Sequence, residues 1–556
     1  MADLRRYRVV IAVLVAGLSL APTLMVTSPS ATAQGSGDLV ELACSMPLRM
    51  LERVWRGWNE DRGPELMWFP REPDFVGSGL PHVGAWDYIQ HIPMFWYGPG
   101  HIRAQGEVTR DVTLADIAPT QATLLGFPFE APDGTAMREA LDGAVGADGY
   151  TPPKLLVVMV WDAAGINVLE EHPDRWPNLA SLIPGGTWYA NAFVGSSPTS
   201  TAQAHSTIGT GAFPRRHGQT GHQMRVGGAI TTPWELGPDF LGIPTLADLY
   251  DKANGNRPVV GVTGTLDIHF GMMGHGAFWH GGDRDIVLTR TGAAGFTLTD
   301  EGAVWNLKGA YAPYYRLAGY ANDVPGFAQD KEALDRADGQ LDGKWLENDI
   351  EALLFGFNTP ARTPYQQRVI ERVIEREDFG ADDLPDLLFA NNKPTDYVSH
   401  KWSMNSTEMG DAVETQDAAL GRMVSFLDDT VGEGEWVLAL TADHAAMPQP
   451  EITGAFQIST GAVTKRLQER FDLDDDDVPV VELVHPTAVF IDEVELEEQG
   501  ATLEELAAYA LTLTKADVAG DIPPAPGTDD DPAFVVAFPS RMMQQMPCLT
   551  DERARG

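Results

Sequence analysis

The sequence has 556 residues, of which 44% are apolar, and a formal net charge of −40 at pH 7. A chain of this length and apolar content can bury a large core, as several domains or as one large α/β domain with insertions. The charge excludes nucleic-acid binding through a basic surface, because such a surface needs clustered lysine and arginine side chains. It also disfavours an anionic substrate unless metal ions reverse the local field.

The first 33 residues are typical of a secretory signal peptide. Three arginines precede a mostly apolar stretch over residues 9–21, and an A-x-A cleavage site ends at Ala33. An uncleaved anchor is the alternative, but Pro22 interrupts a stretch already shorter than the roughly 20 residues of a spanning helix. We therefore expect a secreted or extracytoplasmic protein with no stable membrane insertion after cleavage. In an oxidising compartment its only two cysteines, Cys44 and Cys548, are expected to form a bridge.

Short apolar runs with little polar alternation predict strands that are buried on both faces. They occur in chain order at His91–Tyr97, Leu155–Trp161, Val259–Val262, Asp386–Ala390, Trp436–Thr441 and Thr487–Ile491. Helical patterns lie at Thr415–Leu427 and Leu503–Leu513, the second preceded by a candidate capping box of Thr502 and Glu505. This alternation predicts an α/β fold in which helices cover both faces of a mainly parallel sheet.

Acidic and histidine side chains stand where several of these elements end or begin. Asp162 follows the strand at 155–161, and the pair Asp443 and His444 follows the strand at 436–441. The carboxyl ends of parallel strands face the crevice where α/β proteins bind ligands, although each residue alone can simply start a turn. Asp396 and His400 are four residues apart, which places them on one face of a helix or tight loop. Together these are the ligand types of a two-zinc phosphoryl-transfer site.

The segment PTSTAQAHSTIGTGAFPRRHG, residues 198–218, contains a candidate nucleophile. Thr201 offers a hydroxyl at the start of an expected helix, where it can also act as the N-cap of a helix beginning near Ala202. The two roles are compatible, because free N–H groups at a helix N-terminus favour a phosphate oxygen.

This segment, together with PDLLFANNKPTDYVSHKW (385–402) and VLALTADHAA (437–446), resembles the alkaline phosphatase superfamily, nearest its type I phosphodiesterase/nucleotide pyrophosphatase branch. The resemblance implies an alkaline-phosphatase-like fold and a metal-dependent phosphoric ester hydrolase with two Zn²⁺, or other divalent ions. It implies that Thr201 is the nucleophile of a covalent phosphothreonine intermediate and that the Ala202 N–H is an oxyanion donor. One ion is assigned Asp162, Thr201, Asp443 and His444, and the other Asp396 and His400.

One ligand of the second ion is then missing. In the family it is a histidine near the C-terminus, but the only histidine after His444 is His485, in a strand-like context. The matching segment, HVGAWDYIQHIPMFWYGPGHI, instead begins at His82. The resemblance therefore implies a circular permutant in which His82 is the missing ligand. Residues 34–150 would complete the catalytic domain, and 151–556 would form its main part, with pocket insertions at about 226–384. Cys44 and Cys548 would then lie side by side and staple the new termini.

Departures from the family pattern bear on the substrate, which we expect to be a small-molecule phosphoester. His222 stands where the branch usually has an asparagine that contacts phosphate, and it is either a similar donor or structural. His275 is a second candidate contact, with the same alternative. The segment VTGTLDIHF lacks the lysine or arginine of some monoesterase relatives, which favours diesters or nucleotide pyrophosphates. An alkaline phosphomonoesterase and a catalytically silent binding protein remain alternatives. The missing C/S-x-P-x-R segment excludes a sulfatase.

Overall fold

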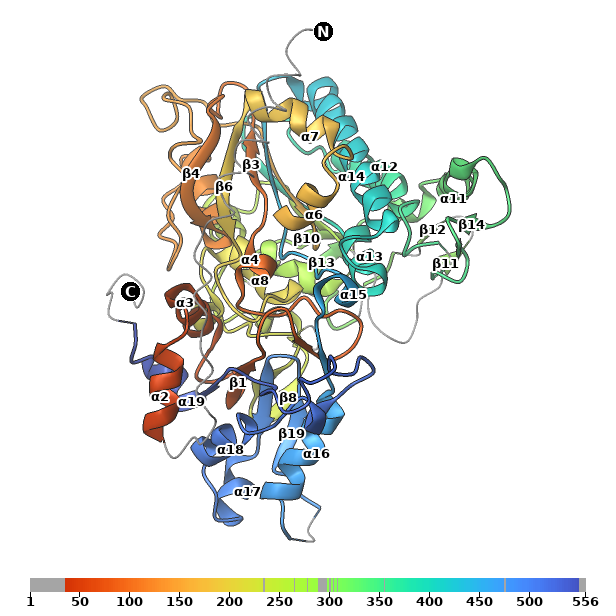
Figure 1. Ribbon diagram of the computed structural model, residues 1–556. Coiled ribbons are helices and arrows are strands. Elements are labelled where there is room, and N and C mark those ends of the chain that lie inside the picture. Colours follow the sequence, from red (N-terminus) through yellow and green to blue (C-terminus); the bar gives the residue numbers. More distant parts are fainter. Residues whose placement is uncertain are drawn as a thin grey trace.

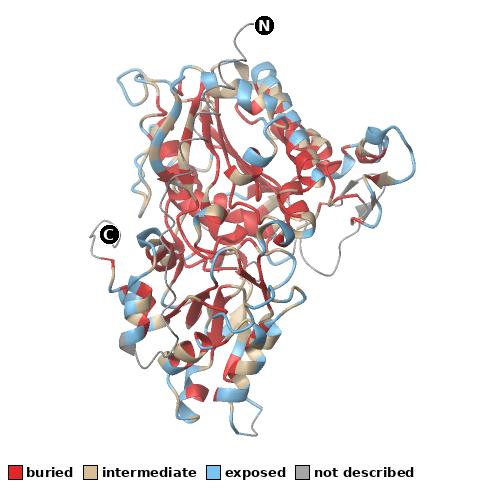
Figure 2. Ribbon diagram, in the orientation of Figure 1, coloured by how far each residue is buried: buried red, intermediate tan, exposed pale blue. Residues whose placement is uncertain are grey.

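The structure, a computed structural model, describes residues 36–549 except 234–235, 265, 278, 289–297, 300–301, 304, 308, 355 and 475–476. The expected signal peptide lies outside the described residues. The chain forms a larger lobe on a nine-stranded sheet and a smaller lobe on a four-stranded sheet (Figure 1). Buried residues fill the interiors of both lobes (Figure 2). Within the described part of the chain, no helix combines the length and apolar character needed to cross a membrane.

The central sheet confirms the predicted mainly parallel architecture. Only β3 runs antiparallel to its neighbours among the nine strands; the other eight share one direction. The strands lie in the order β13 (Tyr315–Leu317), β10 (Asp285–Leu288), β9 (Val260–Thr263), β16 (Asp386–Asn392), β5 (Leu155–Trp161), β17 (Trp436–Thr441), β3 (Met94–Tyr97), β6 (Thr187–Phe193) and β4 (Gly106–Thr113).

Alternate residues of the central strand β5 belong to different hydrophobic cores. Leu155, Val157 and Met159 pack into the core beneath α12 (Arg362–Arg376) and α14 (Thr407–Leu427). Leu156, Val158 and Val160 pack into the opposite core, beneath α5 (Ile117–Leu124), α8 (Thr201–Thr210) and α10 (Leu246–Ala253). Burial on both faces explains why the strand is an unbroken apolar run.

The smaller lobe is built from both ends of the chain. Its antiparallel sheet has the order β19 (Val481–Val484), β20 (Ala488–Ile491), β1 (Leu66–Phe69) and β21 (Val536–Pro539). The predicted strand at 487–491 is therefore β20 of this sheet and not part of the central one. Its helices are α2 (Ser36–Cys44), α3 (Leu48–Gly57), α16 (Thr460–Phe471), α17 (Glu493–Glu498), α18 (Leu503–Ala510) and α19 (Ser540–Gln545).

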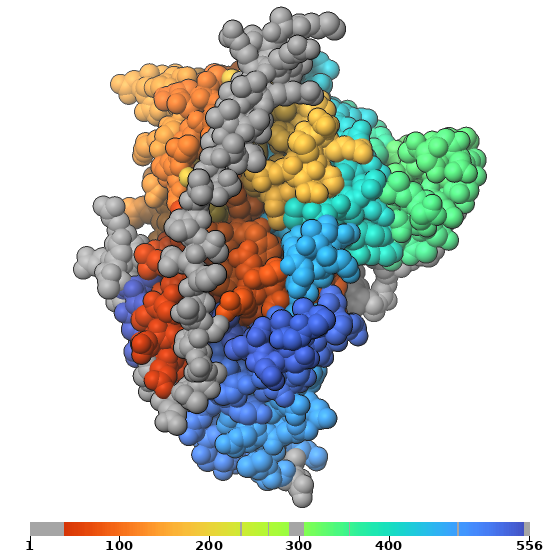
Figure 3. All heavy atoms as spheres, in the orientation of Figure 1, coloured from red at the N-terminus to blue at the C-terminus, as the bar shows by residue number. Residues whose placement is uncertain are grey.

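The predicted disulfide joins the two ends of the described chain. Cys44 at the end of α2 is bonded to Cys548, with their Cα atoms 5.4 Å apart. Figure 3 shows the corresponding red and blue segments in contact on the surface. In the chain-entropy model, a cross-link that closes so long a loop contributes more than about 4 kcal/mol to stability.

The remaining elements are mostly short and connect the sheets. The helices are α4 (Asp87–Gln90), α6 (Ile166–Glu171), α7 (Pro177–Leu182), α9 (Pro214–His217), α11 (Phe327–Asp335), α13 (Pro394–Trp402) and α15 (Pro450–Thr453). Two-stranded pairs are formed by β2 (Phe75–Val76) with β18 (Gln457–Ile458), β7 (Met224–Val226) with β8 (Ala229–Thr231), β11 (Leu298–Thr299) with β12 (Gly302–Ala303), and β14 (Lys344–Trp345) with β15 (Asn348–Asp349).

Candidate active site

The predicted acidic residues meet at one edge of the central sheet. Strand β5 pairs with β17 and β16 so that Val160 lies opposite Thr441, and Trp161 opposite Asn392. This register brings Asp162, after β5, level with Asp443 and His444, after β17. Asp396 and His400 lie one turn apart on α13, which follows β16. The parallel register thus gathers ligands that are far apart in the sequence.

Thr201 is the first residue of α8, and its side chain is buried. The N-cap is Ser200, so the alternative of Thr201 as N-cap is wrong; the Ser200 hydroxyl donates to Gln203 Oε1. Gly209 allows this helix to lie close to the neighbouring 3-10 turn (Asp267–Met272). A Cβ at that position would lie 2.3 Å from the Gly271 carbonyl oxygen. The Thr201 hydroxyl lies at the N-terminus of this helix, where free N–H groups favour a phosphate oxygen.

His82 is hydrogen-bonded to the segment that carries the candidate nucleophile Thr201. The Thr199 hydroxyl donates to the His82 carbonyl at 2.6 Å and accepts from the Gly84 N–H at 3.1 Å. These bonds leave His82 Nε2 3.4 Å from Asp396 Oδ1. A histidine near the start of the chain thus lies beside a carboxylate of α13.

Three histidines share one arrangement around Asp396. The Nδ1 atom of His82 lies 3.2 Å from the Thr199 carbonyl oxygen, that of His400 2.7 Å from Gly79 O, and that of His444 3.0 Å from Ala445 O. Because each Nδ1–H donates to a carbonyl, each Nε2 keeps its lone pair. The three Nε2 atoms lie 3.4, 3.5 and 3.9 Å from Asp396 Oδ1, in the same order. Metal-ligating histidines typically donate their second ring N–H in this way.

Several candidate ligand atoms in this centre make no hydrogen bond with the described residues. Asp396 Oδ1, Asp443 Oδ2 and His444 Nε2 are buried and make no hydrogen bond within the described chain. His444 Nε2 lies 3.3 Å from Asp443 Oδ2 and 3.6 Å from Asp162 Oδ1. Two adjoining groups of converging donors result, His82 with Asp396 and His400, and Asp162 with Asp396 and His444. Carboxylate oxygens and imidazole nitrogens of this kind fit Zn²⁺ or a similar divalent ion.

A buried lysine that the sequence analysis did not single out lies among the carboxylates. Lys393 Nζ is 2.9 Å from Asp162 Oδ1 and 2.9 Å from Asp396 Oδ2. Burial opposes its charge, but the charges of Asp162, Asp396 and Asp443 raise the pKa of Lys393 above its ordinary value. The one available signal was its position three residues before Asp396, on the same face of the first turn of α13.

The carboxylates carry more negative charge than this lysine neutralises. Burial, followed by the charge of Asp162, raises the pKa of Asp443 well above its ordinary value. Burial acts on Asp396 in the same direction, but the charges of Lys393 and His400 hold the pKa of Asp396 well below its ordinary value. Three buried carboxylates facing one ammonium are a site that divalent cations stabilise.

Neutral polar side chains support Asp162 from the other side. Asn391 Nδ2 donates to Asp162 Oδ2 at 2.8 Å and lies 3.0 Å from His205 Nε2. His205 lies on α8 and its Nδ1 is 2.7 Å from the Thr201 carbonyl oxygen of the same helix, so the contact with Asn391 ties α8 to Asp162. Burial lowers the pKa of His205 to about 3, which keeps the ring neutral. Asp162, His205 and His269 form a third group of converging donors on this side.

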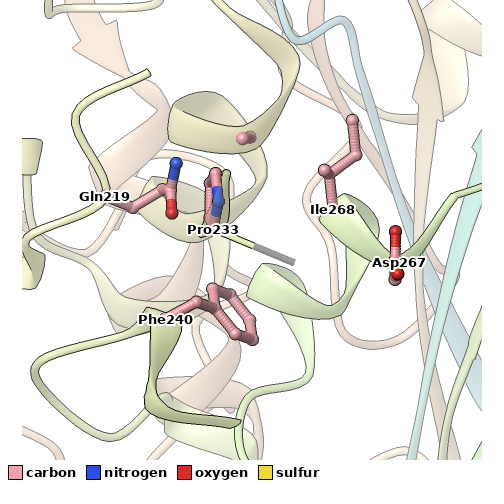
Figure 4. Close-up of a pocket in the computed structure, with 6 residues that line it drawn as sticks. Gln219, Pro233, Phe240, Asp267 and Ile268 are labelled. Atoms are coloured by element: carbon pink, nitrogen blue, oxygen red, sulfur yellow. The ribbon is translucent and has the colours of Figure 1, made fainter. Parts of the chain in front are cut away.

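Two of the three candidate substrate contacts lie beside Thr201. Ala202 is in the first turn of α8, where N–H groups lack intrahelical acceptors. It lines a hollow with Gln219, Pro233, Phe240, Asp267 and Ile268 that has no room for a water molecule (Figure 4). His222 lines a separate cavity with Ser200 and His485. Burial lowers the pKa of His222 to about 3, so that a neutral ring faces this cavity.

His275, the third candidate contact, has its hydrogen-bond partners outside this centre. Its Nδ1 lies 2.9 Å from Asp248 Oδ2, its backbone N–H donates to Asp248 Oδ1, and its Nε2 lies 3.3 Å from the Leu241 carbonyl oxygen. Both ring nitrogens face acceptors, so neither is left for a phosphate oxygen. This arrangement favours the structural alternative for His275.

The His275 ion pair predicts a stability effect that depends on pH. Burial opposes protonation, but the hydrogen bond and charge of Asp248 raise the pKa of His275 above its ordinary value. Its stabilisation is therefore complete below the unfolded pKa and is lost as the pH rises through the folded pKa. We expect His275→Gln to lower the free energy of unfolding by about 1.5–3 kcal/mol at pH 6 and by less at pH 9, with unchanged kcat/KM. Denaturant unfolding at both pH values measures the change in unfolding free energy. A selective loss of kcat/KM would instead support His275 as a substrate contact.

Comparison with known proteins identifies the family of this chain. Residues 156–529 match the family described as type I phosphodiesterase/nucleotide pyrophosphatase. The chain belongs to this family. It is therefore a phosphoric ester hydrolase, and its converging acidic and histidine groups are compatible with metal dependence.

Several curated relatives of this chain are named as alkaline phosphatases. The chain is 24% identical to alkaline phosphatase PafA of Elizabethkingia meningoseptica over 430 residues, which cover 69% of this chain and 77% of PafA. It is 24% identical to PhoV of Synechococcus elongatus and 25% identical to PhoK of a Sphingomonas species, and spans 60% and 56% of their lengths. The crystal structure of wild-type PafA superposes with a TM-score of 0.47 and 19% identity, covering 66% of this chain and 77% of PafA.

Proposed function

We propose that this protein is an exported phosphoester hydrolase that transfers the phosphoryl group of a small-molecule substrate to Thr201 and then to water, with two Zn²⁺ ions. The observation that carries the proposal is the convergence of three imidazole Nε2 atoms on Asp396 Oδ1, next to a hydroxyl at a helix N-terminus. A complete donor set beside an intact nucleophile disfavours a catalytically silent binding protein. The Cys44–Cys548 disulfide supports export.

The ligands divide between the two ions as the family resemblance implies. Asp162, Thr201, Asp443 and His444 would hold one ion, and Asp396, His400 and His82 the other. When bound, such ions polarise phosphoryl oxygens and lower the pKa of a coordinated hydroxyl. Asp396 Oδ1, Asp443 Oδ2 and His444 Nε2, which make no hydrogen bond with the described residues, are the atoms that would bind the two ions.

The reaction is a double displacement at phosphorus. Thr201 Oγ1 attacks phosphorus, the bond to the leaving oxygen breaks, and the hydroxyl proton ends on the leaving alcohol. Water then attacks the phosphorylated threonine and restores the hydroxyl, which releases phosphate when the substrate is a monoester and a phosphomonoester when it is a diester. The Ala202 N–H, in the first turn of α8, and the neutral ring of His222 are donors for the phosphoryl oxygens.

We also propose that the chain is a circular permutant of the family order. Strands β3 and β4 come from residues 34–150 and complete the central sheet, and the same part of the chain supplies His82. Both ends of the chain meet in the smaller lobe, where the disulfide joins them. Termini that lie close together are what makes permutation tolerable.

The choice between diester and monoester substrates depends on the cations beside the nucleophile. The segment VTGTLDIHF supplies no lysine or arginine, which favours diesters and nucleotide pyrophosphates. Lys393, from a different segment, supplies a buried cation at the nucleophile and favours monoesters. An alkaline phosphomonoesterase is therefore the second candidate function.

Trapping the covalent intermediate tests the proposed function. We expect the zinc-loaded protein, mixed with p-nitrophenyl phosphate and quenched in acid, to carry a phosphate adduct on Thr201 that peptide mass spectrometry identifies. We also expect two zinc ions per chain by elemental analysis. Hydrolysis without an adduct, or an adduct on another residue, contradicts the assignment of Thr201.

A further inference from the structure

Lys393 touches the proposed nucleophile as well as the carboxylates. Its Nζ lies 2.9 Å from each oxygen of Asp162, 2.9 Å from Asp396 Oδ2 and 3.3 Å from Thr201 Oγ1. The side chain is buried. The ammonium therefore bridges one carboxylate of each proposed ion site and also reaches the hydroxyl between them.

The contacts of Lys393 with the carboxylates of Asp162 and Asp396 account for only part of its position. An ammonium has three N–H donors, and the 2.9 Å contacts with both oxygens of Asp162 and with Asp396 Oδ2 can engage all three. The longer 3.3 Å contact with Thr201 Oγ1 is a fourth, so one N–H is shared between two oxygens. A phosphorus atom poised for attack lies about 3–3.5 Å from its nucleophile, so the ammonium is within reach of the oxygens of that phosphoryl group.

A cation in this position distinguishes substrates by charge. A phosphomonoester carries two negative charges at alkaline pH, and a phosphodiester carries one. The ammonium therefore attracts the monoester more strongly, and more so because the site is buried and water screens the charges poorly. The two ester classes differ at the oxygen that is free in the monoester and esterified in the diester.

We propose that Lys393 Nζ binds a phosphoryl oxygen during transfer to Thr201 and makes the enzyme prefer phosphomonoesters over phosphodiesters. This proposal rests on the proposed function, since it assumes Thr201 is the nucleophile. Lys393 thereby takes the place of the cation that the segment VTGTLDIHF lacks.

The test compares two chromogenic substrates in Lys393→Met, which keeps the length of the side chain and removes its charge. We expect kcat/KM for p-nitrophenyl phosphate to fall roughly a hundredfold or more, and that for bis-p-nitrophenyl phosphate to fall less than tenfold. Two zinc ions and the phosphothreonine adduct should be retained. The matched control is Lys401→Met, on the same helix, where the exposed ammonium lies over the Trp402 ring; both activities should stay at wild-type levels.

Three results overturn the proposal. Equal losses for the two substrates mean that Lys393 only positions the carboxylates. Loss of zinc or of the fold in Lys393→Met means that its charge serves assembly of the centre. A preference for the diester in the unmodified enzyme excludes the proposal without any variant. If no phosphothreonine forms in the wild type, the proposed function fails instead, which the trapping experiment distinguishes.

Discussion

Thr201→Ala should abolish turnover of both ester classes while leaving the protein folded and loaded with metal. Removal of the hydroxyl deletes the atom proposed to form the covalent intermediate, whereas Asp162, Asp443 and His444 would remain to hold the proposed ion. We expect kcat to fall by at least about a thousandfold, because the loss of a nucleophile is among the largest single effects in covalent catalysis. Steady-state hydrolysis, zinc content and thermal unfolding measure the three parts of this prediction.

Thr207→Ala is the matched control for this change. Thr207 lies on the same helix and is buried like Thr201, and its hydroxyl donates to the Gln203 carbonyl at 3.0 Å and lies 3.2 Å from His217 Nε2. The same atoms are removed in both variants, so any cost to the helix should be similar. Thr207→Ala should keep most of its activity. Equal activities of the two variants would reject Thr201 as the nucleophile.

The parts of the fold that the sequence predicts are those in which local pattern and burial agree. Strands β5 and β17 begin and end where their apolar runs do, because both faces of each are buried. Helix α14 begins at Thr407, eight residues before the start of the predicted helix, because the Ser406 hydroxyl caps it by accepting the Met409 N–H. The capping box of Thr502 and Glu505 is present as predicted.

Long-range pairing was beyond the reach of local pattern. The run at 487–491 is apolar enough for a buried central strand, yet it pairs with β1 in the smaller sheet. Strand β1 in turn lies between two strands from the C-terminal part of the chain. Apolar periodicity shows that a strand is buried, but not which sheet buries it.

In the candidate site, too, some residues could be predicted from local sequence and others could not. The positions of Asp162 and Asp443 follow from their strands, because neighbouring parallel strands in register end at one edge. Lys393 was missed because a lysine after a strand is ordinarily solvated, and only the surrounding carboxylates stabilise its charge in the interior. The pairing of His275 with Asp248 could not be predicted, because nothing in the local sequence indicates it.

His82→Ala should deplete the site of zinc. Removal of this imidazole leaves Asp396 and His400 as the remaining protein ligands of the second ion in the proposed assignment. We expect zinc affinity at this site to fall by at least about a hundredfold, since the loss of even a supporting hydrogen bond costs 10–100-fold, and activity to fall with it. Competition against a chromogenic zinc chelator measures the affinity, and added zinc should partly restore turnover.

His485→Ala is the control that distinguishes the two possible orders of the chain. His485 occupies the position after His444 that an unpermuted chain would use, but it lies in the turn between β19 and β20, where its N–H donates to the Ala488 carbonyl. Burial lowers the pKa of His485 to about 4, so its ring is neutral, and it lines a cavity together with Ser200 and His222. The converging set around Asp396 nevertheless contains His82 and not His485. Zinc binding should therefore survive in His485→Ala, and a larger loss there than in His82→Ala would overturn both the ligand assignment and the permuted order.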